Sequence, residues 1–251
     1  MVSRDELVNY CNGLLAIDNF KDYCPNGLQV EGKAQITRIV AGVTASRALI
    51  EAAIDRGADA LLVHHGYFWR GEDSRVVGMK RERLALLLQH GINLMAYHLP
   101  LDAHPEVGNN VGLGRALGFA DSKTVQGEHS GLLWFSDLTQ PLTTAELSQR
   151  IEGELDRTAL HIDGGAAAIR RVAWCTGGAQ GYLDAAADID ADAFISGEIS
   201  EQTAHIARER GIHYFAAGHH ATERFGARAL LAHLLERFDA EGEFVDIANP
   251  A

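Results

Sequence analysis

The sequence predicts an α/β protein made of two similar α/β lobes with mostly parallel central sheets, joined by a short α+β connector. Two observations support this fold class. Short apolar runs alternate with helix-like segments of about ten residues, an order typical of βαβ units and parallel sheets. Residues 38–64 also align without gaps onto residues 171–197. Repeated order of this kind indicates an internal duplication, so each lobe is expected to be one βαβαβ module.

The alignment sets the expected domain boundaries. We expect a first lobe over 1–126, a connector over 127–165 and a second lobe over 166–251. A chain of 251 residues is long enough for one large domain or two small ones, and we expect the lobes to form one compact unit. A hydrophobic content of 47% with 22% charged residues is typical of a soluble globular protein.

Helix and strand signals alternate through the first half. Ser3 followed by Glu6 is a capping box, which predicts a helix to about Leu15. The segment 22–27 has the composition of a turn. The other expected elements are a short strand at 28–30, strands at 39–43, 58–63 and 92–97, and helices at about 45–56 and 80–90 that end at glycines.

The second half repeats this order after a different connecting segment. The strand GINLMAYH at 91–98 matches GIHYFAAG at 211–218, and a helix is expected before each. The connector is expected to form an α+β segment packed on the sheet. Its expected elements are a strand at 131–137, a turn at Pro141, a helix capped near Thr143 or Thr144, and a strand at 158–163; a helix at 221–238 and a strand at 243–248 should end the chain.

Composition excludes several classes of partner. The net charge of -12 and the absence of a Lys/Arg run argue against binding to nucleic acid. No apolar run approaches the roughly 20 residues of a membrane span, and the acidic N-terminus does not resemble a signal peptide. The three cysteines are unevenly spaced, which indicates reduced thiols rather than a disulfide framework. We therefore expect a cytoplasmic protein.

The residues with the clearest chemistry begin where the strand at 58–63 ends, at His64, His65 and Gly66. Successive side chains of a strand point to opposite faces. The two rings can therefore share one ion only if the strand breaks there, which Gly66 would permit. Alternatively, each ring faces its own ion in a two-metal centre. A third interpretation has one histidine packed and the other solvated, without metal.

The ends of the next equivalent strands supply carboxylates. Asp102 lies four residues after His98, and Glu223 lies four residues after His219. Side chains four residues apart on a helical turn share one face and can meet on one ion. Pro100 favours a turn in the first segment. Glu223 is expected in the first turn of its helix, where the helix dipole alone also favours a carboxylate.

Together, these strand ends predict a metal site. His64, His65, Asp102, His219 and Glu223 are the expected ligands of two divalent metal ions, bridged by one carboxylate. Nitrogen and oxygen donors without thiolate favour Zn, Fe, Mn or Ni.

Other residues near these strand ends are candidates for supporting roles. His98, His104 and His220 are candidates for orienting ligands or relaying protons, and His98 is the candidate catalytic residue. Residues 68–70, Phe-Trp-Arg, either cover the site and touch an anionic or aromatic substrate or simply pack.

Several motifs together carry a family resemblance, from about residue 20 to the end of the chain. They are DYCPNGLQVEG, GVTAS, VHHGYFW, HLPLDAHP, WCTGG, SGEISEQTAH and AAGHHATER. With these motifs the chain resembles the dinuclear-metal-centre proteins related to NGG-one interacting factor three. The bacterial members of that family are called GTP cyclohydrolase I type 2 homologues.

The resemblance implies a fold, an assembly and a ligand set. It implies a pair of α/β lobes and a toroidal homohexamer, a trimer of dimers, with metal pairs facing an inner cavity. The family's ligand positions match the five ligands named above. Longer members carry an inserted domain between the halves, which the short connector of this chain does not contain.

The activity that the resemblance implies is hydrolytic opening of the imidazole ring of a GTP-like nucleotide. A metal-bound hydroxide would attack the purine C8, and His98 or a neighbouring residue would move protons. The sequence contains no P-loop glycine motif to anchor the triphosphate. The alternative is a metal-binding ring scaffold or regulatory protein without turnover.

Overall fold

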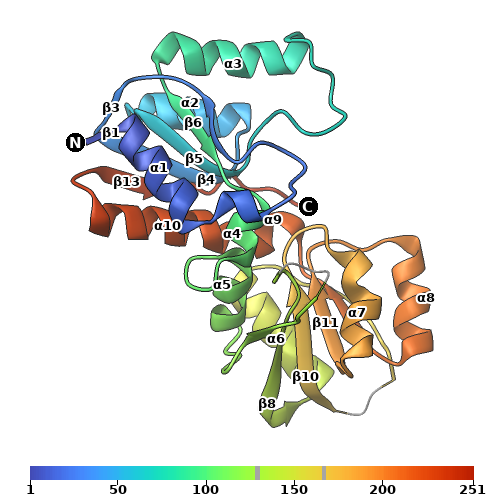
Figure 1. Cartoon of the computed structure of the whole chain (residues 1–251). Helices are drawn as coiled ribbons and strands as arrows, with labels where there is room; N and C mark the ends of the chain where they lie inside the picture. Colours follow the sequence, from blue (N-terminus) through green and yellow to red (C-terminus); the bar gives the residue numbers. More distant parts are fainter. Residues whose placement is uncertain (128–130, 166–167) are drawn as a thin grey trace. The chain divides into compact units, whose positions relative to one another are not determined.

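The computed structural model describes residues 1–127, 131–165 and 168–251, and it confirms the α/β class (Figure 1). The chain forms two compact units. The first comprises 1–108 with 226–248, and the second comprises 109–225 with 249–251. These units differ from the expected lobes because the chain returns to the first unit after residue 225. The expected lobe boundary at 166 falls outside the described residues.

The first unit is built on a five-stranded sheet with the order β13-β4-β5-β6-β2. Strands β13, β4, β5 and β6 are parallel, and β2 runs antiparallel to β6. Their bounds are β2 Gly27–Val30, β4 Arg38–Thr44, β5 Ala60–His65, β6 Asn93–Ala96 and β13 Glu241–Phe244; a separate pair joins β1 Val2–Ser3 to β3 Gln35–Ile36. The three central strands thus confirm the parallel sheet expected for this half.

Helices cover this sheet on both faces. Their bounds are α1 Arg4–Leu14, α2 Arg47–Asp55, α3 Gly78–His90, α4 Leu99–Ala103 and α10 Arg224–Arg237, with a short 3-10 helix η1 at Ile17–Asn19. One apolar cluster joins α1 and α10 to the sheet, and another joins α2 and α3 to it. The expected cap of α1 is confirmed, because the Ser3 hydroxyl accepts the Glu6 amide N–H at 3.2 Å.

The second unit has a six-stranded sheet with the order β7-β8-β10-β11-β12-β9. Strands β10, β11 and β12 pair parallel to one another, whereas β7 with β8, β8 with β10 and β9 with β12 pair antiparallel. Its elements are β7 Lys123–Thr124, β8 Trp134–Leu142, β9 Leu160–Ile162, β10 Ile169–Cys175, β11 Ala193–Ser196, β12 His213–Ala216, α5 Asn109–Ala116, α6 Thr144–Leu155, η2 Gln180–Tyr182, α7 Leu183–Asp188, α8 Glu201–Arg210 and α9 His219–Thr222. The segment expected to pack on the sheet therefore extends it, through β8 and β9.

Two local expectations are wrong. Pro141 lies inside β8 rather than in a turn, at an irregular part of its pairing with β10, where a missing N–H costs little. The C-terminal helix expected at 221–238 is two helices, α9 and α10, because the backbone at Glu223 leaves the helical conformation with φ -108° and ψ 10°. No helix among the described residues is long and apolar enough to span a membrane.

A carboxylate holds the start of the first parallel strand in each unit. In the first unit, Asp59 Oδ2 accepts the amide N–H groups of Thr37 and Arg38 at 2.9 and 3.1 Å. In the second unit, Asp192 Oδ2 accepts two amides of β10 at 2.7 and 2.9 Å. Burial alone would raise the pKa of Asp59, but hydrogen bonds from Lys33 and from the two amides outweigh burial and lower it.

Asp59→Ala should lower the free energy of unfolding by about 1–3 kcal/mol, because two strand amides lose their acceptor. Urea denaturation measures this, with Asp55→Ala at the exposed end of α2 as the matched control. Folding lowers the pKa of Asp59, so its charge stabilises the protein above about pH 4 and this contribution is lost as the pH falls below that value. A stability difference that is the same at neutral and at strongly acidic pH would contradict the role of the charge.

Candidate metal centre

The histidine pair of the first unit lies at the carboxyl end of β5. Both His64 and His65 belong to the strand, and His65 is paired in register with Thr44 of β4. The strand therefore does not break at the histidine pair, which was the condition for the interpretation in which both rings share one ion. Gly66 is needed for close packing instead, since a Cβ there would collide with the Gln29 amide group and lie 2.6 Å from the Ala96 Cβ. The two rings nevertheless approach each other, with centroids 4.5 Å apart.

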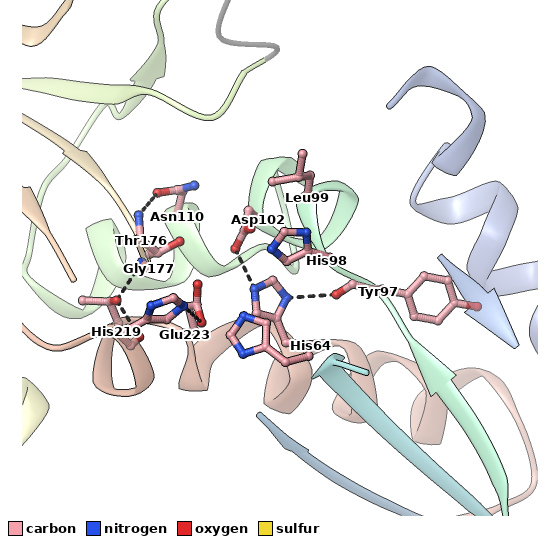
Figure 2. Close-up of polar contacts among 12 residues, drawn as sticks. His64, Tyr97, His98, Leu99, Asp102, Asn110, Thr176, Gly177, His219 and Glu223 are labelled. Carbon is pink, nitrogen blue, oxygen red and sulfur yellow. Dashed lines mark hydrogen bonds and ion pairs between the residues drawn. The ribbon is translucent and has the colours of Figure 1, made fainter. Parts of the chain in front are cut away.

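Each ring of the pair has one nitrogen held by an oxygen of the first unit. His64 Nδ1 lies 2.9 Å from the Tyr97 carbonyl oxygen, and His65 Nδ1 lies 3.2 Å from the Thr44 hydroxyl oxygen. A carbonyl oxygen can only accept, so the ring proton of His64 lies on Nδ1 and its Nε2 carries the lone pair. The Thr44 hydroxyl can donate or accept, so its contact orients the His65 ring without fixing the tautomer. His64 Nε2 lies 3.4 Å from Asp102 Oδ1 (Figure 2). Two imidazoles and a carboxylate thus gather at this strand end.

Asp102 lies on α4, which follows β6 directly. The turn expected around Pro100 is a short helix, because proline in the first helical turn removes no amide that the helix needs. His98 precedes this helix as its N-cap residue, and the Asp102 side chain is buried. The strand end therefore places the carboxylate and His98 on one short segment.

His98 is held by two residues of the segment expected only as a turn. Its Nδ1 lies 2.6 Å from Asp22 Oδ1, and its backbone N–H donates to Asn26 Oδ1 at 2.7 Å. Burial alone would raise the pKa of Asp22, but the hydrogen bond and charge of His98 outweigh it and lower the pKa to about 2. One ring nitrogen from each of His64, His65 and His98 lies within 4.8 Å of those of the other two.

The second unit carries its own imidazole–carboxylate group at the end of β12. His219 Nε2 lies 3.1 Å from Glu223 Oε2 (Figure 2). Its Nδ1 lies 2.7 Å from Glu198 Oε1. Burial alone would lower the pKa of His219, but the two carboxylates outweigh it and raise the pKa to about 9. The metal-free imidazole is therefore protonated near neutral pH, and a metal ion that binds there must displace a proton.

The loop after β10 supports Glu223. Gly177 has φ +71°, and a Cβ at this position would collide with the Glu223 carboxylate. The Gly177 amide donates to the Thr222 hydroxyl at 3.0 Å, and this hydroxyl lies 2.9 Å from the carbonyl oxygens of Gly218 and His219. Glu223 lies between two helices, as the C-cap of α9 and the residue before the start of α10, rather than inside the first turn of a helix.

The remaining candidates have more local contacts. His104 Nδ1 accepts the amides of Glu106 and Val107, both at 3.2 Å, so this ring caps a turn. The backbone amide of His220 donates to the Ala251 carbonyl at 3.1 Å. Trp69 lies with its ring 4.9 Å from that of His98, edge to face, so the loop after Gly66 packs beside the histidines of the first unit.

Sequence reasoning identified the ring-bearing residues but not Asp22 or Glu198. Asp22 lies 76 positions from His98 in the chain, so no local spacing connects them. Glu198 follows β11 in the motif SGE, and the only available signal was its place at the end of a strand next to β12 in the sheet. Both carboxylates hold the Nδ1 of an imidazole, which is the usual second contact of a histidine ligand.

The fold and the histidine and carboxylate groups at its strand ends together indicate the class of protein. The chain is an α/β protein whose parallel strands end in histidines and carboxylates, with imidazole Nδ1 atoms held by oxygens. These groups could hold a metal ion. The chain belongs to the Duf34/NIF3 (NGG1p interacting factor 3) family, whose model matches residues 2–250.

Relatives and solved structures agree with this assignment. The chain is 54% identical to the GTP cyclohydrolase 1 type 2 homolog of Allochromatium vinosum, over 100% of this chain and 98% of that protein. It is 53% identical to the Escherichia coli protein of the same name, over the full length of both. The structures of protein ybgI and of TTHA1606 from Thermus thermophilus both cover 100% of this chain and are themselves covered in full, with TM-scores of 0.94 and 0.90 at 52% and 38% identity.

Glu198→Gln should lower the pKa of His219 by roughly one unit, because one of its two carboxylate neighbours loses its charge. NMR titration of the imidazole in metal-free protein measures the change. Glu201→Gln is the matched control, since Glu201 pairs with the surface residue His205 instead. An unchanged His219 pKa in the Glu198 variant would contradict the contact.

Proposed function

We propose that this protein is a metal-dependent hydrolase that acts on a GTP-like nucleotide. The proposed ligands of two divalent metal ions are His64, His65, Asp102, His219 and Glu223. The observation that carries the proposal is that the three imidazoles each have Nδ1 hydrogen-bonded to an oxygen atom. Such a contact orients the ring of a histidine ligand in known metal sites.

The metal ions would supply Lewis acidity and activate water near neutral pH. The protein's own residues would hold and orient them. Asp102 and Glu223 would balance the cationic charge, and the hydrogen bonds at Nδ1 would fix each ring. Glu198, hydrogen-bonded to His219 Nδ1, would keep a proton on Nδ1, so that the proton displaced by the incoming cation is the one on Nε2.

A nucleotide substrate is supported by the relatives and by residues near His98. The relatives at 53–54% identity are named as homologues of a GTP cyclohydrolase. In the first unit, the Tyr23 ring is 56% exposed and lies 6.4 Å from the His98 ring. The Arg70 guanidinium lies over the same tyrosine at 5.6 Å. An exposed aromatic ring beside a cation suits a base that stacks and a phosphate that needs a positive charge.

The alternative proposal is a ring-shaped scaffold that binds metal without turnover. The homohexamer implied by the family resemblance belongs to this proposal and to the hydrolase equally. Exposed apolar side chains support such an assembly. Val77, just before α3, and Met79 and Leu88 within it are 55%, 64% and 63% exposed. Light scattering before and after chelation tests whether metal holds an assembly together.

Glu223→Gln should lower both the bound metal and the turnover by at least about 100-fold, because the variant replaces a charged ligand with a neutral one. Elemental analysis gives the metal content, and a nucleotide hydrolysis screen with and without chelator gives the activity. Glu209→Gln, on the exposed face of α8, is the matched control.

The outcomes separate the two proposals. Hydrolysis that needs metal and fails in the Glu223 variant supports the hydrolase. Metal bound at full occupancy with no turnover on any purine nucleotide supports the scaffold instead. A Glu223 variant that keeps its metal and its turnover would rule out the proposed ligand set.

A further inference from the structure

We propose that His213, in the second unit, is a pH-dependent switch: the neutral imidazole holds the Gly164 amide at the end of edge strand β9, and the protonated imidazole releases it. His213 is the first residue of β12, whereas the proposed metal ligand His219 follows the other end of that strand. The switch is therefore separate from the candidate metal centre, and it does not depend on the proposed function.

The His213 ring must be neutral to make its contact with the backbone. The residue is 1% exposed, and its Nδ1 accepts the Gly164 amide N–H at 3.1 Å. An amide N–H can only donate, so Nδ1 of the imidazole carries the lone pair. A proton on Nδ1 occupies this lone pair, and the charged imidazole then presents a donor to a donor. Protonation of His213 therefore breaks the contact.

Gly164 links this contact to the edge of the sheet. A Cβ at Gly164 would lie 2.2 Å from the Ile212 carbonyl carbon and 2.6 Å from the His213 nitrogen, so the two backbones are in close contact. Gly164 follows β9, which is the last strand of its sheet and pairs with β12 over three residues. So short a ladder has few hydrogen bonds, and the loss of the Gly164 contact loosens the end of β9.

Two groups can accept the proton of a charged His213. His161 Nε2, on β9, lies 3.2 Å from its Nδ1, and Asp163 Oδ1 lies 3.4 Å from it. Burial and the neighbouring His213 lower the pKa of His161, although Asp163 opposes them, so the His161 ring stays neutral in mildly acidic solution. Nδ1 thus has a donor in front of it for its neutral form and two acceptors for its charged form, which makes two alternative arrangements of one contact.

Other charged side chains on the elements around β12 have partners of their own. Asp192, just before β11, accepts two amides of β10 at 2.7 and 2.9 Å. The partners on α8, on α6 and in the segment after α6 are Arg210 with Asp184 and Asp188, His205 with Glu201, Glu152 with Thr158, and Arg157 with the Pro250 carbonyl. His161 and Asp163 are thus the titratable groups that the switch uses.

The first unit holds a matching glycine with a side chain that does not titrate. Asn93 is the first residue of β6, and its Oδ1 accepts the Gly32 amide N–H at 2.8 Å. A Cβ at Gly32 would lie 2.7 Å from the Asn93 nitrogen, much as at Gly164. The backbone amides of Asn93 and His213 each donate at 2.9 Å to the carbonyl of the aspartate before the neighbouring strand. An amide oxygen accepts at any pH, so only the contact of the second unit responds to protons.

The test is NMR of the full-length chain with ¹⁵N-labelled glycine and ¹³C-labelled histidine, titrated from about pH 8 to about pH 5. The Gly164 amide signal should move with the same midpoint as the His213 ring signal, because one proton controls both. Hydrogen exchange of Gly164, corrected for the intrinsic effect of pH, should lose protection by about 10-fold, since one buried hydrogen bond is broken. The Gly32 amide of the same molecule is the internal control, and its signal should stay constant.

His213→Asn places the acceptor of the first unit in the second unit. This variant should keep the Gly164 contact and abolish the titration of its amide, because an amide side chain gains no proton in this range. His205→Asn is the matched control, since this exposed histidine of α8 pairs with Glu201 instead. The Gly164 titration should be unchanged in the control.

Four results decide the inference. A Gly164 amide that follows the His213 titration in the wild type but not in His213→Asn supports the switch. A constant Gly164 signal while His213 gains its proton overturns it, and so does a His213 ring that stays neutral down to about pH 5. A Gly164 titration that persists in His213→Asn also overturns it. If thermal melting shows that His213→Asn is unfolded, the two midpoints in the wild type decide alone: equal midpoints support the switch, and different ones contradict it.

Discussion

An imidazole has two nitrogens, and only the one with a lone pair can bind a cation, so the site depends on what holds the other nitrogen. In the first unit, residues of the sheet provide the oxygen atoms that contact the Nδ1 atoms of His64 and His65. The parallel register of β4 and β5 places the Thr44 hydroxyl beside His65, and the end of β6 places the Tyr97 carbonyl beside His64. A shift of β5 by one residue would turn both histidine side chains to the other face and remove both contacts.

The features that could be predicted from sequence are those with a local physical signal. Alternating apolar and amphipathic segments, with glycines at helix ends such as Gly91, predicted the order of strands and helices in both halves. The parallel strands also placed chemical groups correctly at their carboxyl ends, because connected parallel strands end on the same edge of a sheet. His64, His65 and Asp102 were found in this way, and the structure brings these three together in the first unit.

Long-range partners and interrupted elements could not be predicted in the same way. Asp22 lies in a segment with turn composition, and nothing nearby in the sequence indicates that its carboxylate reaches His98. The division of the C-terminal helix at Glu223 was also missed, because the residues on both sides favour helix, and the Gly177 loop that contacts Thr222 and Glu223 is distant in the sequence. Pro141 was predicted to lie in a turn because proline is rare inside strands. Its place in β8 depends on the irregular pairing with β10, which has no local signal in the sequence.

The first unit is assembled from two separate stretches of chain, and this affects the order of events on the ribosome. Residues 109–225 emerge as one uninterrupted block and contain nearly all of the second unit, whereas β13 reaches its place beside β4 only after the 226–248 stretch is made. Until then, one edge of β4 lacks its neighbour, and the apolar face that Leu230 and Leu234 will cover is bare. The unit whose synthesis starts first is therefore completed last, which exposes nascent chains to aggregation during translation.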